Sequence, residues 1–423
     1  MLTLLKKIIP KSLFDALAPT YHWLLARTGS IITRFPSREL IVVGVTGTKG
    51  KSSTLEFMNA ILEEAGFTTA IASTIRFKIG NESRPNLFKM TMPGRFFVQQ
   101  FLREARTKGA THALVEMTSE GAKQYRHAFI DLDALIVTNI APEHIESHGS
   151  FENYLAAKLS IGESLAHSSK SRRILVSNAE DQGLEPFRKI TNVEQLPYSL
   201  AAATSVVVTP EKTELFLGET KITINIPGEF NAKNALAAIT LAQAWGIDIL
   251  PIKRGIEKLK TIPGRVEDVT KEIPSAPFRV IVDYAHTPDS LANLYGAFAN
   301  IPKVCVLSGT GGGRDTWKRP TMGGIADQYC TEIILTDEDP YDEDPAKIVR
   351  EIAVGITSKK PVIEMDRRVA IREALKRAPK GSVVLITGKG TDPYIMGPNG
   401  TKTPWSDAAV ATEELKAHLA TRN

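Results

Sequence analysis

Residues 41–54 read IVVGVTGTKGKSST, and this stretch decides the fold that we expect for the first half of the chain. An apolar run leads into three glycines, which are followed by Lys51, Ser52 and a helical pattern that starts at Leu55. Glycines allow backbone N–H groups to approach a phosphate closely, and the N-terminus of a helix favours negative charge. The stretch therefore predicts a strand, a phosphate-binding loop and a helix, in that order.

The match to the usual phosphate-binding pattern, G-x-x-x-x-G-K-[ST], fails at one position, because Val45 stands in place of the first glycine. The strand before the loop and the helix after it both fit the pattern, so an ordinary glycine-rich turn is the weaker alternative. In the preferred interpretation Lys51 reaches the terminal phosphates, and the Ser52 hydroxyl holds a magnesium ion. The residues expected to bind the nucleotide here are Gly47, Thr48, Lys49, Gly50, Lys51, Ser52 and Ser53.

Composition places the chain among soluble globular proteins of two or three domains, since 43% of its 423 residues are hydrophobic and 23% are charged. The net charge of +5 is consistent with anionic substrates. No block of basic residues is interleaved with aromatic residues, so nucleic acid is not an expected partner. The two cysteines, Cys305 and Cys330, predict neither a disulfide framework nor a zinc site, and they fit a reducing cytoplasm.

Residues 1–35 are apolar and carry three lysines near their start. They have no small-residue cleavage site and no uncharged run of about 18 residues, so they predict neither a signal peptide nor a transmembrane helix. Pro10 and Pro19 are expected to divide the segment into short helices. Two interpretations follow: an amphipathic segment that holds a cytoplasmic protein at the inner face of the membrane, or a helical pair packed against the next domain.

The chain after the loop alternates between strand and helix patterns. Strands are expected at residues 68–74, 112–116, 135–138 and 173–177, and helices at residues 95–109 and from Ser150 onward. Functional groups gather at the carboxyl ends of parallel strands in open α/β sheets. Glu116 and Asn139 stand at such ends, which makes both of them candidates for the site.

Lys158 lies among small and apolar residues on the helix expected from Ser150. Periodicity alone favours a solvated lysine, or one that reaches out of an apolar surface, over a lysine at a metal or phosphate site. His144 and His148 precede this helix, and capping or surface positions are open for both. Residue pattern by itself therefore leaves the roles of these three residues undecided.

Three short strand patterns, at residues 205–209, 213–217 and 221–226, predict a small antiparallel addition. The helix expected over residues 231–246 carries Asn231 and Asn234 on its first turn. Asparagine is common at helix caps, so a structural role is credible for Asn231 and less so for Asn234.

A second alternation follows Pro263 and Gly264, which are interpreted as a linker. Strands are expected at residues 278–284, 303–309, 331–337 and 382–388, and helices around residues 287–299, 318–329, 344–356 and 366–377. The predicted fold is α/β: a P-loop domain with a mostly parallel sheet and a small antiparallel addition, followed by a second doubly wound domain without its own P-loop. The predicted parts are a helical segment (1–40), an ATP-binding domain (41–262) and a Rossmann-like domain (263–423), with a cleft that closes on ATP and a second substrate.

Several separated motifs resemble the Mur ligase family, and within it the UDP-N-acetylmuramoyl-tripeptide synthetases. They are TGTKGKSS (46–53), NIAPEHIESHGSFENYLAAK (139–158), VDYAHTPDSL (282–291), GRDTWKRPTMG (313–323) and GKGTDPY (388–394). The resemblance runs from about residue 41 to the C-terminus, and the P-loop motif of that family also lacks the first glycine.

The resemblance implies an ATP-dependent ligase of peptidoglycan precursor synthesis. In that family ATP phosphorylates the carboxylate of a UDP-muramoyl peptide, and the amine of an incoming amino acid attacks the acyl phosphate. A related ligase with a non-muramoyl acceptor, of the folylpolyglutamate, poly-glutamate or cyanophycin type, is the alternative. A non-enzymatic scaffold is disfavoured, because the residues that phosphoryl transfer needs are present together.

The resemblance also implies roles for individual residues. The residues implied to be catalytic are Lys51, His144 and Lys158, and those implied to hold magnesium are Ser52, Glu116, His144 and Lys158. Lys158 matches a carbamylated lysine, whose added carboxylate supports a second magnesium ion. Such a modified side chain is compatible with a metal site, whereas a free ammonium is not.

Further implied roles concern the substrates. Asn231 and Asn234 match adenine contacts, Asp283 matches a ribose contact, and Arg265 and Arg319 match residues near the terminal phosphate and the incoming amino acid. The positions implied to grip the muramoyl substrate are Thr91, Thr118, Gln124 and Arg126.

Two departures from the family pattern change what we expect of the substrates. Only 43 residues precede Gly44, where the family has an N-terminal uridine-nucleotide domain, so the acceptor is expected to be presented differently, at the membrane, by the apolar N-terminus. The family's DNPR segment, which selects diaminopimelate, is replaced by residues 338–341, EDPY. With the arginine absent and Asp339, Gly388 and Asp392 expected at the subsite, the sequence predicts a basic diamino acid such as lysine or ornithine.

Overall fold

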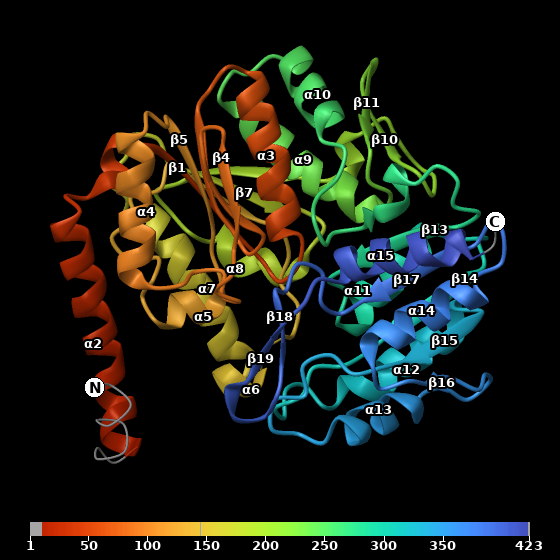
Figure 1. Ribbon diagram of the computed structural model, residues 1–423. Helices are drawn as coiled ribbons and strands as arrows, with labels where there is room; N and C mark the ends of the chain where they lie inside the picture. Colours follow the sequence, from red (N-terminus) through yellow and green to blue (C-terminus); the bar gives the residue numbers. More distant parts are fainter. Residues whose placement is uncertain (1–10, 144, 422–423) are drawn as a thin grey trace. The chain divides into compact units, whose positions relative to one another are not determined.

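A computed structural model describes residues 11–143 and 145–421 of the chain, with side chains described from Leu17 onward. The chain divides into two compact units (Figure 1). Unit 1 comprises Met1–Ala202 and Asn234–Ile256, and unit 2 comprises Ala203–Lys233 and Glu257–Asn423. The boundaries expected at residues 40 and 262 stay a prediction.

Unit 1 is built on an eight-stranded sheet in the order β4-β3-β2-β5-β1-β6-β7-β8. The strands are β1 (Ile41–Thr46), β2 (Thr69–Ala72), β3 (Arg76–Ile79), β4 (Glu82–Pro85), β5 (His112–Glu116), β6 (Ala134–Val137), β7 (Ile174–Asn178) and β8 (Glu194–Tyr198). Six neighbouring strands are parallel, namely β2, β5, β1, β6, β7 and β8. Strands β3 and β4 extend the sheet as an antiparallel hairpin. The first strand thus lies at the centre, beside β5 and β6, which brings the loop after it next to their carboxyl ends.

Helices cover both faces of this sheet, because a parallel sheet buries both of its faces. The helices of unit 1 are α2 (Lys11–Ile32), α3 (Lys51–Glu64), α4 (Arg95–Thr107), α5 (Ser119–Lys123), α6 (Ile145–His148), α7 (Phe151–Ala166), α8 (Glu185–Arg188), the part of α9 (Glu229–Ala244) from Asn234 onward, and most of α10 (Ile249–Lys258). On one face, α4 and α7 share a hydrophobic core with the strands. On the other face, α3 packs against β1, β2 and β5.

The strands and helices expected in unit 1 after residue 40 are confirmed within a few residues, but several elements were missed, among them α10, a hairpin and an edge strand. The hairpin of β3 and β4 lies in a segment read as turn-rich, because β4 has the sequence ESRP and all four residues are exposed. Strand β8 was missed because it pairs only with β7, at the edge of the sheet, and most of its residues are not buried. Edge strands lack the apolar runs on which the prediction relied.

The N-terminal segment differs from expectation, because α2 is one helix of 22 residues with Pro19 inside it. The proposed break at Pro19 is therefore wrong, whereas Pro10 lies outside the described residues. The helix packs along α4 (Figure 1), and this packing offsets the hydrogen bond that a proline removes from a helix. Among the residues with described positions, no helix combines the length and apolarity needed to cross a bilayer.

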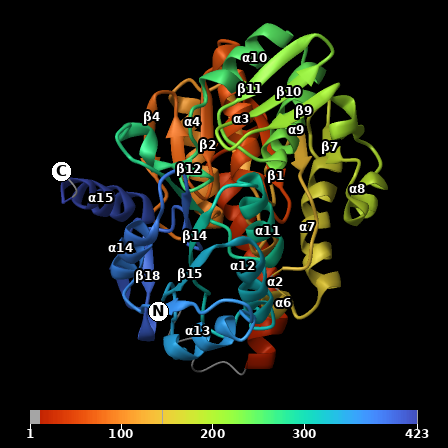
Figure 2. The same ribbon diagram turned by 90° about the vertical axis from the view of Figure 1, so that its right-hand side faces the viewer.

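Unit 2 contains a six-stranded sheet in the order β12-β13-β17-β14-β15-β16, parallel except at β12. Its strands are β12 (Glu267–Asp268), β13 (Arg279–Asp283), β14 (Lys303–Leu307), β15 (Glu332–Leu335), β16 (Val362–Ile363) and β17 (Val383–Thr387). Its helices are α11 (Pro288–Ala297), α12 (Lys318–Tyr329), α13 (Pro345–Ala353), α14 (Arg367–Arg377) and α15 (Asp407–Ala420). Helices α14 and α15 pack on one side of the sheet and α11 and α12 on the other (Figure 2), which confirms the second doubly wound sheet.

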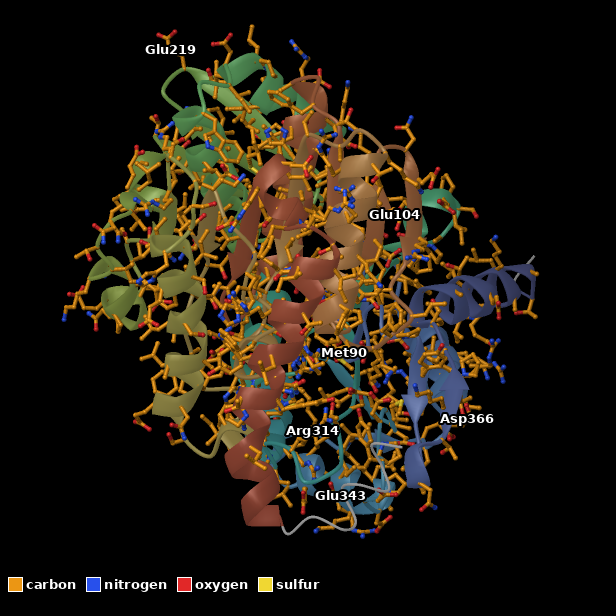
Figure 3. All side chains as sticks on the ribbon, turned by 90° about the vertical axis from the view of Figure 1, so that its left-hand side faces the viewer. Met90, Glu104, Glu219, Arg314, Glu343 and Asp366 are labelled. Atoms are coloured by element: carbon orange, nitrogen blue, oxygen red, sulfur yellow. A yellow bond between two sulfur atoms is a disulfide. The ribbon has the colours of Figure 1, made fainter. Side chains whose placement is uncertain are left out.

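Two small antiparallel sheets complete unit 2. One is formed by β9 (Ser205–Val208), β10 (Thr213–Leu217) and β11 (Thr220–Ile224), as predicted, with Glu219 at the tip of its second turn (Figure 3). The other pairs β18 (Tyr394–Met396) with β19 (Lys402–Pro404). Pro263 and Gly264, interpreted as a linker, form the tight turn of a bridge between Ile262 and Arg265.

The cysteines contradict the sequence-based expectation, because Cys305 and Cys330 are bonded to each other. Cys305 lies on β14, and Cys330 follows α12, immediately before β15. The two cysteines are 25 positions apart in the sequence, and the chain between them makes one crossover through a helix to the neighbouring parallel strand, which leaves the two Cα atoms 6.1 Å apart. Cysteine usage therefore no longer supports a reducing compartment.

A buried ion pair ties α14 to α15 in unit 2. Arg367 donates from Nε and Nη2 to the two carboxylate oxygens of Asp407 at 2.8 and 2.6 Å, and both side chains are almost fully buried. We expect Asp407→Ala to lower the free energy of unfolding by about 3 kcal/mol, because it leaves a buried guanidinium without its carboxylate. Urea denaturation measures this, with Arg350→Ala, which removes an exposed ion pair to Asp344, as a control expected to cost less than about 1 kcal/mol. Equal losses in the two variants would contradict the prediction.

Candidate active site

The loop between β1 and α3 is held in one shape by the end of the neighbouring strand. Gly47 has φ +138°, and a Cβ there would lie 2.0 Å from Thr138 Oγ1, so only glycine fits. The backbone N–H of Lys49 donates to Asn139 Oδ1 at 2.9 Å, and Asn139 Nδ2 donates back to Lys49 O at 3.0 Å. Asn139 therefore supports the P-loop, at the strand end where the sequence placed it.

Lys51 begins α3 and folds back over this loop. Its Nζ donates to Gly47 O at 3.1 Å and to Thr48 O at 2.9 Å. Val45, which replaces the first glycine of the usual pattern, is a fully buried residue of β1. The strand therefore continues through Thr46, and the glycine that lies close to the neighbouring strand end is Gly47.

Glu116 lies beside the P-loop at the carboxyl end of β5 and is 2% exposed. Its Oε2 accepts hydrogen bonds from Ser52 Oγ at 2.9 Å and from the Thr74 N–H at 2.9 Å, and its Oε1 accepts one from Thr74 Oγ1 at 2.9 Å. Thr74 Oγ1 is also 2.7 Å from Thr91 Oγ1. Thr74 was missed by the sequence analysis, although its place just after β2 obeys the same strand-end rule that identified Glu116.

Lys158 points inward from α7 and is 2% exposed, so the interpretation as a solvated side chain is wrong. Its Nζ donates to Gly47 O at 2.7 Å and lies 5.0 Å from the centre of the Tyr154 ring. Burial, and then the positive charge of Lys51, hold the pKa of Lys158 well below its usual value. The same site thus contains two lysines, one of which is driven toward its neutral form.

Tyr154 and Thr48 connect α7 to the P-loop, since their hydroxyl oxygens are 2.7 Å apart. This contact was not foreseen from the sequence, where Tyr154 had no assigned role. Asn234 lies behind the loop, where its Oδ1 accepts a hydrogen bond from Thr54 Oγ1 at 3.4 Å. His148 is buried rather than at the surface, and His144 lies outside the described residues.

The positions matched to the acceptor lie after β5 and before α4. Gln124 Oε1 accepts from Arg126 Nη2 at 2.7 Å, and the Gln124 carbonyl accepts from Arg95 Nε at 3.0 Å. Burial, and then Arg95, lower the pKa of Arg126. Thr118 caps α5 by accepting a hydrogen bond from the Gly121 N–H at 3.1 Å. Gln124 and Arg126 are brought together, with Arg95 as a further cation that the sequence analysis overlooked.

In unit 2, Asp283 stands at the carboxyl end of β13 and accepts hydrogen bonds from the N–H groups of Val266 and Ala285, each at 2.7 Å. Burial raises the pKa of Asp283 although Arg265 opposes this shift. Arg265 stacks on the Tyr284 ring, with its Cζ 4.6 Å from the ring centre. Asn231 is buried and donates from Nδ2 to Pro227 O at 2.9 Å.

Arg319 is the largest of the fully buried side chains among the described residues, with 1% exposure. Its Nη1 donates to Glu343 Oε1 at 2.7 Å and to Glu351 Oε2 at 2.6 Å. The hydrogen bond from Arg319 is the main reason that the pKa of Glu343 falls to about 2. Glu343 also accepts from the Gly313 N–H at 3.2 Å, which brings it close to the loop that carries Arg314 (Figure 3). The two carboxylate partners of Arg319 were not foreseen from the sequence.

A second charged group of unit 2 gathers around Lys389. Its Nζ is 2.9 Å from Asp339 Oδ1 and 3.9 Å from Asp392 Oδ2. Gly388 has φ +108°, and a Cβ there would lie 2.3 Å from Glu338 Oε2. Asp339, Gly388 and Asp392 are therefore neighbours, as predicted, and the lysine between the two aspartates is the member that the sequence analysis omitted.

The described part of the chain contains no group of three or more histidine, cysteine, aspartate or glutamate side chains that could hold a metal ion. Mg²⁺ does not need such a group. It keeps several waters and binds through one or two protein oxygens together with substrate phosphates. The adjacent Ser52 hydroxyl and Glu116 carboxylate, at the mouth of a phosphate-binding loop, fit that requirement.

Comparison with known proteins identifies this architecture. The Mur ligase middle domain matches residues 45–242, and the Mur ligase glutamate ligase domain matches residues 264–390. A UDP-N-acetylmuramoyl-L-alanyl-D-glutamate–2,6-diaminopimelate ligase of Aquifex aeolicus is 35% identical, over 90% of this chain and 78% of its own length. The chain belongs to the Mur ligase family.

Other relatives agree with this assignment. A UDP-N-acetylmuramyl-tripeptide synthetase of a Roseiflexus species is 34% identical, over 94% of this Mur ligase and 82% of its own length. A solved structure of a UDP-N-acetylmuramoyl-L-alanyl-D-glutamate–2,6-diaminopimelate ligase superimposes with a TM-score of 0.62 at 25% identity, covering 94% of this chain and 83% of the other. The α/β fold is confirmed, and the Mur ligase is an enzyme that forms an amide bond with ATP and Mg²⁺.

Proposed function

We propose that this Mur ligase joins a diamino acid to the terminal carboxylate of a UDP-N-acetylmuramoyl peptide, in the synthesis of a peptidoglycan precursor. The observation that carries the proposal is the group formed by Lys51, Ser52, Glu116 and Lys158 around one P-loop. This group is suited to phosphoryl transfer, and the relatives named as tripeptide synthetases or diaminopimelate ligases supply the substrate class.

The reaction has two chemical steps. A carboxylate oxygen of the acceptor attacks the γ-phosphorus of ATP, ADP leaves, and an acyl phosphate remains. The neutral amine of the incoming amino acid then attacks the acyl carbon, phosphate leaves, and the amine loses a proton as the amide forms. Because the transferred phosphoryl group carries most of the charge, catalysis depends on cations and N–H donors placed around it. Lys51, the N–H groups of the P-loop and the N-terminus of α3 have that role.

Ser52 and Glu116 are the residues that would hold Mg²⁺, with His144 as a further ligand. When bound, the ion neutralises phosphate charge and orients the terminal phosphates. Thr74 has a positioning role, because it donates two hydrogen bonds to Glu116 and so orients the carboxylate.

Lys158 is proposed to be carbamylated. Its neutral amine attacks carbon dioxide, a C–N bond forms, and one proton is released to water, which leaves a carboxylate beside the ammonium of Lys51. Burial and the nearby Lys51 favour the neutral amine that this reaction needs. The carbamate places a negative charge at this buried position, where it pairs with the ammonium of Lys51. An ammonium on Lys158 could not form such a pair.

Carbamylation is tested by ¹³C NMR of the enzyme in ¹³C-bicarbonate. We expect a carbamate resonance in the unaltered protein that disappears in Lys158→Gln, while the other lysines, including Lys51, stay in place as internal controls. A resonance that persists in Lys158→Gln, or none in the unaltered protein, would assign Lys158 a different role.

The remaining roles follow from the matched positions. Thr91, Thr118, Gln124 and Arg126 are proposed to bind the muramoyl acceptor, and the half-buried Arg126 would pair with one of its anionic groups. Asn231 and Asn234 are proposed to contact adenine, Asp283 the ribose, and Arg265 the terminal phosphate. Arg319 is proposed to lie near the incoming amino acid, in an orientation fixed by Glu343 and Glu351.

The choice of amino acid is proposed to depend on the group around Lys389. Asp339 and Asp392 both approach this one ammonium, and Glu338 lies against Gly388. These three carboxylates favour a substrate with a distal ammonium over one with a distal carboxylate. We propose lysine or ornithine as the preferred amino acid.

Tyr341→Arg tests this selectivity, because it restores the arginine of the diaminopimelate-selecting segment. We expect the ratio of kcat/KM for meso-diaminopimelate to that for L-lysine to rise by at least about tenfold, the value of one charge-assisted hydrogen bond. Tyr341→Phe is the matched control and should leave the ratio unchanged. A preference of the unaltered enzyme for meso-diaminopimelate would show that the acidic group does not set selectivity.

The function is tested by phosphate release from ATP, with a panel of acceptors crossed against L-lysine, L-ornithine, meso-diaminopimelate and L-glutamate. We expect release only when a UDP-N-acetylmuramoyl dipeptide and one diamino acid are both present. Release with a folate or poly-glutamate acceptor alone would place the enzyme in another branch of the Mur ligase family.

A further inference from the structure

Helix α2 presents an apolar face that unit 1 does not cover. Leu17, Tyr21, Leu24, Ile31 and Ile32, which we call the outer face of α2, recur at intervals of a helical period. The four aliphatic side chains among them are each more than half exposed, and Ile32 reaches 66%. Apolar residues on the surface usually occur singly, so a stripe of this length indicates a binding surface.

The opposite side of the helix shows that α2 is anchored rather than loosely attached. Ala26, Gly29 and Ser30 are buried there, and α2 packs against α4. A Cβ on Gly29 would lie 3.5 Å from the Phe96 ring, so the two helices approach closely. Figures 1 and 3 show α2 along the side of unit 1, with its other side directed away from that unit.

The sequence of the N-terminal segment has one dominant sign of charge. Residues 1–34 contain five basic residues and one acidic residue, Asp15, a net charge of +4 in a chain whose total is +5. Arg27 and Arg34 are exposed in the described part of this segment. In the segment that follows, the carboxylate of Glu39 contacts Arg103 and Arg106, so it adds no unbalanced negative charge. An apolar stripe bordered by cations matches an anionic lipid surface.

We propose that the outer face of α2 binds the anionic surface of a phospholipid bilayer, with the helix parallel to the membrane plane. The apolar side chains enter the boundary between headgroups and acyl chains, and the basic residues contact lipid phosphates. Tyr21 suits this depth, because its ring is apolar with one polar atom. The inference is independent of the ligase reaction, since α2 carries none of the residues proposed to bind substrates.

A second copy of the chain is the competing occupant, and the charge pattern argues against it. A two-fold interface brings the same surface of both copies together, so the basic residues of the N-terminal segment of one copy would lie near those of the other. Lipid phosphates, in contrast, provide the opposite charge.

The test is flotation of the full chain with vesicles. We expect binding to vesicles that contain phosphatidylglycerol, little binding to pure phosphatidylcholine, and weaker binding at high salt. The double variant Ile31→Gln/Ile32→Gln should lower the partition coefficient by about tenfold or more, because it removes two apolar side chains from the contact. Leu250→Gln is the matched control, since Leu250 is 59% exposed on α10, and it should bind as the unaltered protein does.

Three results would overturn the proposal. The first is no binding of the unaltered chain to phosphatidylglycerol vesicles, and the second is equal loss of binding in the double variant and in Leu250→Gln. The third is a dimer in sedimentation velocity that dissociates in the double variant, which would identify a second copy as the occupant. Unchanged phosphate release by the double variant in solution would confirm that it folds. Loss of vesicle binding can therefore be distinguished from loss of ligase activity.

Discussion

Lys51→Ala is expected to lower kcat for phosphate release by about 1,000-fold, equivalent to about 4 kcal/mol of transition-state stabilisation. The reason is geometric, because Nζ of Lys51 lies over the P-loop, 2.9 Å from Thr48 O, where the terminal phosphates of ATP would be held. Its positive charge stabilises the transition state of phosphoryl transfer more than it stabilises bound ATP. The effect should therefore appear in kcat and not only in the KM for ATP.

The control for this experiment is Lys108→Ala, which removes an exposed lysine of the same unit that pairs with Glu82 and Glu104. It should leave kcat within about twofold, because exposed ion pairs contribute little. Circular dichroism of both variants shows whether the fold is retained. If Lys51→Ala raised the KM for ATP and left kcat unchanged, the lysine would bind the ground state and the transition state equally, contrary to the prediction.

Glu116→Gln is expected to lower kcat by about 100- to 1,000-fold and to shift the magnesium dependence of activity to higher concentration. The substitution keeps the shape of a side chain that is 2% exposed and accepts hydrogen bonds from Ser52 and Thr74, so the local structure should persist. It removes the negative charge, and Mg²⁺ prefers a charged oxygen ligand. A titration of phosphate release with MgCl₂ separates the metal affinity from the rate at saturation.

Glu104→Gln is the matched control, because it removes one carboxylate charge from the surface of the same unit. It should leave both the rate and the magnesium dependence as they are. If Glu116→Gln lowered the rate but not the affinity for magnesium, Glu116 would act by orienting Ser52 and Thr74 and not as a metal ligand.

Much of the fold follows from local pattern. The apolar run of β1, the glycines after it and the helical pattern that starts at Leu55 specify strand, loop and helix in one continuous stretch. The antiparallel addition was readable for the same reason, since alternation and turns are properties of neighbouring residues. The hairpin of β3 and β4 was not, because its outer strand is polar and exposed, and only its pairing with β3 defines it.

The site was predictable where chemistry coincides with strand ends. Glu116 and Asn139 stand at the carboxyl ends of β5 and β6, and both contact the P-loop or the helix after it. The buried position of Lys158 was not predictable from the spacing of residues, because a helix pattern does not indicate which face of the helix packs on the sheet. The resemblance to the Mur ligase family pointed to Lys158, and the packing of α7 explains its depressed pKa.

The sequence by itself therefore determined the two α/β alternations, the P-loop and the identity of the groups that can move a phosphoryl group, because these depend on residues close together in the chain. Tertiary structure alone decided which charges lie close together: Lys158 with Lys51, Arg319 with Glu343, and Lys389 with Asp339. It also decided that α2 leaves one apolar face exposed. These features depend on the rotation of each helix against its neighbours, and that rotation is set by the packing of residues far apart in the sequence.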